Sequence, residues 1–234
     1  YLIRENVYNK KSNFALTPKQ LREIFYQKRW QNIVGFHTRN IIHSGHEYIQ
    51  KRSLEISNAD AILISPVTGH KKSGDFKSEP IIDSYQKLIK DEIYKPYGAI
   101  LSSFDTYSRY CGPREAIFTA LCRKNYGCNS FIIGRDHTGI GNYYKPNESS
   151  EIFDKFDLGM NIIKFDKVYY NKKNNLVTDK KMPTINEELI VEISATKIRD
   201  ALIKGEEIPD YIARPEVIEI CQKLIAKDLN KIFH

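Results

Sequence analysis

The chain of 234 residues carries 36 Lys and Arg against 29 Asp and Glu, a formal net charge of +7, and 41% of its residues are hydrophobic. This composition is sufficient for one large α/β domain and excludes a disordered chain. The basic residues are scattered rather than grouped, which argues against a nucleic-acid-binding arm. No stretch approaches the roughly 20 apolar residues of a membrane span, and the first residues lack the apolar segment of a signal peptide. We therefore expect a cytoplasmic protein without nucleic-acid or membrane partners.

Alternation of apolar runs with amphipathic stretches predicts a parallel α/β sheet. The predicted strands are residues 32–36, 61–65, 99–103, 130–134 and 162–168. The predicted crossover helices are residues 45–57, 80–93 and 113–124, and two further helices over 196–203 and 215–227 form a C-terminal tail. Residues 170–188 are polar and are expected to form a surface excursion. Open parallel sheets bind ligands beyond the carboxyl ends of their strands, so the residues after each run are candidate site residues.

The first strand leads into the motif His43-Ser44-Gly45-His46, at a predicted helix N-terminus. Free backbone N–H groups and the positive end of the helix dipole attract phosphate at such a position. Two imidazole donors there can hold phosphate oxygens as negative charge moves onto them. The alternative is a helix cap with incidental histidines.

Between that strand and the motif lie Thr38, Arg39 and Asn40. Arg39 offers a planar pair of donors to an oxyanion, and its two neighbours add neutral donors.

Three other segments are candidates for phosphate contacts. Gly134, Arg135, Asp136 and His137 follow the fourth strand, with a surface Arg–Asp turn as the alternative. Ser194, Thr196 and Arg199 lie at a predicted helix start, where two hydroxyls and a cation suit a triphosphate, although Ser-x-Thr is more often only a cap. The loop from Val67 to Phe76 is basic and is expected to be mobile, either closing on phosphate or simply solvated.

Together these segments resemble the catalytic domain of the ATP sulfurylase family. The family's QTRN and HxGH elements resemble residues 37–40 and 43–46; GPREA, RKNYGC and GRDH stand unchanged at residues 112–116, 123–128 and 134–137; ISGTxxR and RPEV resemble residues 193–199 and 214–217. The resemblance implies a Rossmann-like HxGH nucleotidyltransferase parallel sheet with a small helical C-terminal subdomain. We divide the chain into a lead-in segment (1–30), a catalytic domain (31–192) and a phosphate-contacting helical subdomain (193–234); the family's N-terminal PUA-like domain is not recognisable.

The resemblance also implies a role for each matching residue. It implies catalytic roles for Thr38, Arg39 and Asn40, and an oxyanion contact for His37, Arg39 and Thr138. Nucleotide or phosphate contacts are implied for His43, His46, Gly134, Arg135, Asp136, His137, Val168, Ser194, Thr196 and Arg199. ATP would be the substrate, with Mg²⁺ carried mainly by its phosphates and water.

Several positions depart from the family's pattern. His37 replaces Gln, Thr138 replaces Ala and Ala195 replaces Gly, all on the acceptor side. The imidazole of His37 introduces either a cation suited to a phosphate or phosphonate dianion, or a neutral donor like the amide it replaces. The family's zinc ligands are replaced by Asn171, Asn174, Met182 and Thr184, with Pro183 retained, so we expect no zinc.

Three functions remain open on the sequence. The first is sulfate adenylyl transfer from ATP; the second keeps the fold but uses another oxyanion, such as a phosphonate or phosphorylated metabolite, with ATP or CTP. The third is a non-catalytic nucleotide-binding module. The substrates in the first two cases are small molecules, and a homo-oligomer or a fusion to further domains is compatible with the sequence.

Overall fold

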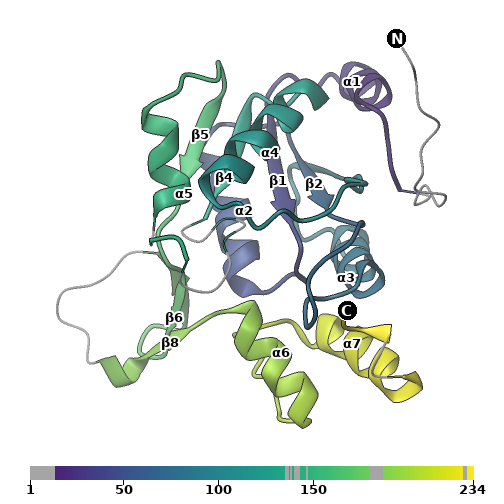
Figure 1. The fold of residues 1–234 in the computed structure, drawn as a ribbon, viewed down its shortest axis with the longest axis vertical. Helices are drawn as coiled ribbons and strands as arrows, with labels where there is room; N and C mark the ends of the chain where they lie inside the picture. The colour runs from purple at the N-terminus through teal and green to yellow at the C-terminus, as the bar shows by residue number, and fades with distance from the viewer. Residues whose placement is uncertain are drawn as a thin grey trace.

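A five-stranded parallel sheet forms the centre of the computed structural model, which describes residues 14–134, 137, 139, 143–145, 147–179, 187–228 and 231–234 (Figure 1). The strands are β1 (Ile33–Thr38), β2 (Ala61–Pro66), β3 (Gly98–Leu101), β4 (Ser130–Ile133) and β5 (Asn161–Lys164). Their order is β3-β2-β1-β4-β5, and every neighbouring pair is parallel, which confirms the predicted α/β class. The order reverses between β1 and β4, and this is where open sheets of this class bind ligands.

Helices cover both faces of the sheet. They are α1 (Pro18–Gln27), α2 (Ser44–Ile56), α3 (Ser78–Lys90), α4 (Pro113–Tyr126), α5 (Glu148–Glu151), α6 (Ala195–Lys204) and α7 (Pro215–Lys227), with 3-10 turns η1 (Ile152–Asp154) and η2 (Glu187–Leu189). The five helices predicted from periodicity are confirmed as α2, α3, α4, α6 and α7, close to their predicted bounds. Helix α4 shows why: it opens with Pro113 and ends at Gly127, whose φ of 103° is the left-handed conformation of a helix C-cap.

The fifth strand is shorter than predicted. It ends at Lys164 rather than Val168, because its partner β4 ends at Ile133. The N–H of Phe165 makes one more bond to the carbonyl of Ile133, and the chain then leaves the sheet. The remainder of the apolar run therefore lines the ligand cavity described below instead of extending the strand.

A second, three-stranded antiparallel sheet replaces part of the predicted surface excursion. It is ordered β7-β6-β8 and consists of β6 (Tyr169–Asn171), β7 (Leu176–Thr178) and β8 (Ile190–Glu192). Residues 180–186 of that segment lie outside the described part of the chain. Strand β8 ends two residues before Ser194, which precedes α6, so the small sheet is joined directly to the start of α6.

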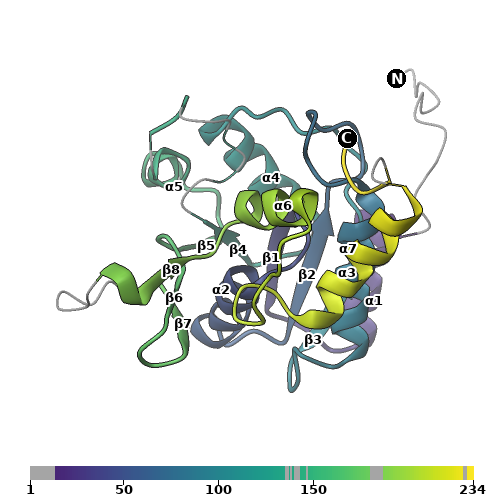
Figure 2. The ribbon, with the colours of Figure 1, turned by 90° about the horizontal axis from the view of Figure 1, so that it is seen from below.

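The C-terminal helices share the hydrophobic core of the main sheet. Ile198 of α6 and Val217 of α7 are buried in the same cluster as Phe36 and Ile64. Helix α7 lies beside α3, as both views show (Figures 1 and 2). On the other face of the sheet, Leu21 and Phe25 of α1 pack with Ile33 and Leu63. The division at residues 30 and 192 stays a prediction. Among the described residues, no helix is long and apolar enough to cross a membrane.

Candidate nucleotide-binding site

A cavity of about 270 Å³ opens at the carboxyl ends of β1 and β4. Among the residues predicted from sequence, those that line it are His37, Thr38, Arg39, Asn40, His43, His46, Gly134, His137, Val168 and Ser194. Thr196 and Arg199 do not line it, and Arg135, Asp136 and Thr138 lie outside the described residues. The topology therefore brings most of the predicted clusters to one place.

His43 is the N-cap of α2, and its ring orientation is fixed by the helix itself. Its Nδ1 accepts a hydrogen bond of 3.2 Å from the backbone N–H of His46. A nitrogen that accepts carries no proton, so the neutral ring holds its proton on Nε2. Burial lowers the pKa of His43 well below its usual value, with a smaller contribution from His46. His43 thus presents a neutral N–H donor at the N-terminus of the helix.

The second histidine of the motif stacks on the first. The rings of His43 and His46 lie 3.7 Å apart with an interplanar angle of 18°. A Cβ on Gly45 would lie 3.2 Å from the His43 ring, so glycine leaves room for this arrangement. Burial lowers the pKa of His46 to about 4, and its Nδ1 has no hydrogen-bond partner within the described structure. Both imidazoles are neutral near pH 7 and, beside the helix N-terminus, form a site suited to phosphate oxygens.

The turn after β1 is closed by its own side chains. Thr38 Oγ1 accepts from the N–H of Asn40 and donates to its carbonyl, both at 3.1 Å. Thr38 is therefore engaged in the turn rather than free. Asn40 Oδ1 is buried without a partner among the described residues, so it is available to a ligand.

Arg39 is held from three sides and leaves one nitrogen open. Its Nη2 donates to the carbonyl of Gly139 at 3.1 Å, its Nε lies 3.5 Å from Asp75 Oδ2, and its guanidinium lies over the Tyr110 ring at 4.9 Å. Its Nη1 is buried and has no partner in the described part of the chain. A fixed guanidinium with one unused donor, lining the cavity, is suited to an oxyanion.

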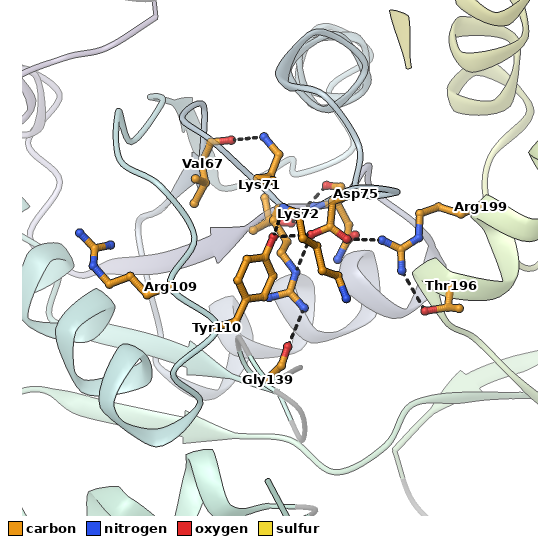
Figure 3. Close-up of polar contacts among 12 residues, drawn as sticks. Val67, Lys71, Lys72, Asp75, Arg109, Tyr110, Gly139, Thr196 and Arg199 are labelled. Atoms are coloured by element: carbon orange, nitrogen blue, oxygen red, sulfur yellow. Dashed lines mark hydrogen bonds and ion pairs between the residues drawn. The ribbon is translucent and has the colours of Figure 1, made fainter. Parts of the chain in front are cut away.

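Asp75, which lies beside Arg39, also contacts Tyr110 and Arg199 (Figure 3). This carboxylate is 1% exposed and accepts from the Tyr110 hydroxyl at 2.9 Å and from Arg199 Nη1. Arg199 also donates to Thr196 Oγ1 at 3.0 Å. Arg199 and Thr196 therefore brace the carboxylate that positions Arg39, and in this structure they do not face the cavity.

The loop from Val67 to Phe76 is exposed at His70, Ser73 and Gly74 and is buried at other positions, and its mobility stays a prediction. Lys71 is 1% exposed, and its Nζ donates to the Val67 carbonyl at 3.0 Å. Burial lowers the pKa of Lys71 to about 8. The N–H of Gly69 donates to the Thr106 carbonyl, and the loop ends in the buried Asp75 and Phe76. The two ends of the loop and Lys71 are therefore held by burial and by hydrogen bonds.

His37 carries no charge in this site, which favours the neutral donor of the two alternatives that the sequence left open. Burial lowers its pKa well below the usual value, and Arg123, His137 and Arg39 lower it further. Arg123 Nη2 lies 2.9 Å from its Nδ1. The neutral-donor alternative is the one that this geometry supports.

His137 follows β4 and is also neutral. Its Nε2 lies 3.1 Å from Thr119 Oγ1, and that hydroxyl donates its only proton to the Ala116 carbonyl. His137 Nε2 is therefore the donor of the pair. Burial lowers the pKa of His137 to about 3, with further lowering by Arg39 and Arg123.

Sequence reasoning missed about half of the cavity wall. The missed side chains are Phe36, Ile49, Ile132, Phe165, Asp166, Lys167, Glu192 and Ile193, whereas Ala195 was placed on the acceptor side. Lys167 and Glu192 form an ion pair at 2.6 Å, close in sequence to the first residue of α6. The apolar members were identified as core from their periodicity, and nothing in that pattern separates a core residue from one that lines an apolar slot.

A metal centre is not assembled in the described part of the chain: no group of three or more His, Cys, Asp or Glu there could hold a metal ion. Of the positions that replace zinc ligands, Asn171 is buried, and its Oδ1 accepts from the N–H of Lys173 at 2.9 Å. Met182, Pro183 and Thr184 lie outside the described residues. All four cysteines are free.

The strand order and the cavity at its switch point define a doubly wound α/β domain of the nucleotide-binding class. The solved structure of a hexameric APS kinase from Thiobacillus denitrificans shares this fold, with a TM-score of 0.70 over 94% of this chain and 41% of that chain at 18% identity. The chain belongs to the ATP-sulfurylase family, whose model matches residues 12–224.

Curated proteins that are similar in sequence to this chain are sulfate adenylyltransferases. The chain is 42% identical over 210 residues to a sulfate adenylyltransferase of Pyrococcus abyssi, covering 89% of this chain and 55% of the relative. It is 41% identical over 223 residues to one of Halothermothrix orenii, covering 94% and 57%. The chain therefore spans about half the length of the curated relatives it matches. A nicotinic acid mononucleotide adenylyltransferase of Plasmodium falciparum shares the fold at a TM-score of 0.50 and 13% identity, over 85% of this chain and 96% of that chain.

Proposed function

We propose that this chain is the catalytic domain of a sulfate adenylyltransferase, which transfers the adenylyl group of ATP to sulfate and releases pyrophosphate. The observation that carries the proposal is the cavity at the β1–β4 switch point. It combines the His43–His46 pair at a helix N-terminus with an unused donor of Arg39 and an apolar wall. Membership of the ATP-sulfurylase family and the curated relatives support the same activity.

In this proposal the protein supplies position and charge stabilisation rather than a covalent nucleophile. A sulfate oxygen attacks the α-phosphorus in line, the bond from that phosphorus to the α–β bridging oxygen breaks, and pyrophosphate leaves with its electron pair. The N–H group of His43 stabilises the leaving pyrophosphate at the N-terminus of α2, and the ring of His46 stacks on His43. Arg39 Nη1 and His37 hold sulfate, and the backbone at Val168 contacts adenine beside the apolar wall.

Magnesium belongs to the substrate in this scheme. The described lining holds four histidines and one arginine, and of its two carboxylates, Asp166 and Glu192, the latter is paired with Lys167. Mg²⁺ prefers oxygen ligands, so it is expected to arrive on the triphosphate oxygens with its own water. Turnover on small molecules in the cytoplasm, without nucleic acid, is part of the same proposal.

No observation favours a different acceptor. The phosphonate alternative was motivated by a cationic His37, and the imidazole is neutral here because of burial and Arg123. The non-catalytic alternative is opposed by the open polar atoms of the site, since the donor Arg39 Nη1 and the acceptor Asn40 Oδ1 are buried without described partners.

The deciding experiment measures pyrophosphate release from Mg-ATP with sulfate, with molybdate and with no acceptor. Molybdate mimics sulfate, and its mixed anhydride hydrolyses, which draws the reaction forward. Release with either oxyanion supports the proposal; silence with both, in a folded protein that binds ATP, rejects it. Arg39→Ala should abolish release and leave ATP binding nearly unchanged. The matched control is Arg52→Ala, an arginine of α2 whose side chain is 47% exposed and paired with Glu55, which should retain full activity.

A further inference from the structure

Arg123 is a fully buried cation without a carboxylate partner. This residue of α4 is 0% exposed, and no described carboxylate lies within ion-pair distance of it. Its Nη2 donates to the Ser65 carbonyl at 3.3 Å, and its guanidinium lies 4.3 Å from the centre of the Phe104 ring. Its Nε and Nη1 are buried without described partners. An uncompensated buried charge destabilises a fold. The presence of Arg123 at this position therefore suggests a functional role.

The remaining contact of Arg123 Nη2 is His37 Nδ1, at 2.9 Å. A guanidinium carries only N–H donors, so the atom that faces it must be an acceptor. His37 Nδ1 is therefore unprotonated, and the single proton of the neutral ring resides on Nε2. Turning the ring over would place a C–H group against the guanidinium and lose the hydrogen bond.

The other neighbours of His37 do not favour a charged ring either. They are the neutral His137 after β4, with ring centres 5.6 Å apart, the edge-on ring of Phe104 at 6.2 Å, and the cations Arg39 after β1 and Arg109 before α4. His37 lines the cavity, and its Nε2 has no partner among the described residues. The proton on Nε2 is thus available to a bound oxyanion.

We propose that Arg123 is a positioning residue that holds His37 as a neutral, Nε2-protonated donor toward the acceptor oxyanion. His37 then offers the same pattern as an amide side chain, with one atom accepting from Arg123 and one N–H donating to the ligand. Recognition of the oxyanion by this residue does not depend on pH in the range where an ordinary histidine titrates, near 6.5. The oxyanion role rests on the proposed function, whereas the protonation state of His37 does not.

The first test is nitrogen-15 NMR of the histidine side chains in the wild-type protein. Long-range proton–nitrogen correlations should show His37 with a protonated Nε2 and a bare Nδ1 from pH 6 to pH 8. A proton on Nδ1, or a cationic ring in that range, overturns the proposal whether or not the chain turns over sulfate. His37→Gln assigns the signal by its disappearance.

The second test measures the KM for sulfate between pH 6 and pH 8 in Arg123 variants. Wild-type protein and Arg123→Lys, which keeps a donor-only cation, should show a flat profile. Arg123→Met removes the hydrogen bond that fixes the tautomer and the largest charge contribution that lowers the pKa of His37, leaving the contribution of burial, and should change the KM by about threefold or more across this range. Combining Arg123→Met with His37→Gln should restore the flat profile, because an amide does not titrate.

Arg22→Met is the control, since that exposed guanidinium donates to the carbonyls of Lys124 and Asn125 and makes no contact with His37. It should leave both the His37 signal and the profile unchanged. A flat profile in Arg123→Met, or one that His37→Gln does not correct, rejects the positioning role. Absence of sulfate turnover together with the expected His37 signal rejects the proposed function alone.

Discussion

Asp75→Asn is the most informative perturbation of the cluster around Arg39. The substitution keeps the shape of the side chain, removes its charge and turns an N–H₂ group toward one of its donors. Removing one partner of a buried ion pair costs about 3–5 kcal/mol. Asp75 is 1% exposed, but the side chains of Arg39 and Arg199 are 20% and 16% exposed, so solvent screening reduces the expected loss of folding free energy to about 2 kcal/mol.

The effect on catalysis should be larger than the effect on folding. Without Asp75, Arg39 Nε loses its anionic neighbour, and a misplacement of about 1 Å at a catalytic group costs about 100-fold in rate. We therefore expect kcat for pyrophosphate release to fall about 100-fold, while the KM for ATP changes by less than about threefold, since His43 and His46 are untouched. Urea unfolding monitored by circular dichroism measures the change in folding free energy separately.

The matched control is Asp91→Asn, which breaks a surface pair with Lys87 and should leave both kcat and stability close to wild type. A wild-type kcat in folded Asp75→Asn would refute the positioning of Arg39 by this carboxylate. A reduced kcat that merely follows the folded fraction would assign Asp75 to stability alone.

Two further predictions concern stability. Arg214 bonds Glu47 through two nitrogens, each at 2.8 Å, but its side chain is 42% exposed; Arg214→Met should therefore lower the free energy of unfolding by only about 1 kcal/mol, measured in urea, and a loss above about 3 kcal/mol would contradict the screening argument. Burial lowers the pKa of His46 to about 4 and of His137 to about 3, so the unfolded chain binds protons below pH 6.5 that the folded chain does not. Stability should fall as the pH drops from 6.5 toward 4, by up to about 2 kcal/mol for each ring at pH 5, and a flat melting temperature between pH 7.5 and pH 5 would refute this.

The main sheet and the position of the site could be predicted because both depend on local patterns. Pro113 and Gly127 mark the ends of α4, and the motif from His43 to His46 follows β1 at the place where parallel sheets bind ligands. The small antiparallel sheet could not be predicted in this way. Its strands are three residues long, too short for an alternating pattern to be distinguished from a polar loop.

The charge state of the site could not be predicted either, because it depends on contacts between distant residues. His37 is neutral because it is buried and because Arg123, 86 residues further along the chain, approaches its Nδ1. Arg199 has the composition of a phosphate contact, yet it pairs with Asp75 from 124 residues away. Local sequence shows which side chains are cationic, and only the packing decides which of them are already paired.

The N-terminus of α2 is attached to the C-terminal tail as well as to the site. Ser44 Oγ donates to the Tyr211 carbonyl at 2.7 Å, its N–H donates to the Ile212 carbonyl at 2.9 Å, and Glu47 holds Arg214. A phosphate-bearing ligand that orders this end of α2 therefore also strengthens the attachment of residues 211–214. Thermodynamic linkage makes the effect reciprocal. A change that loosens residues 211–214 therefore weakens ligand binding by the same factor. The tail is in this sense an effector of the site, and nucleotide should protect it from proteolysis.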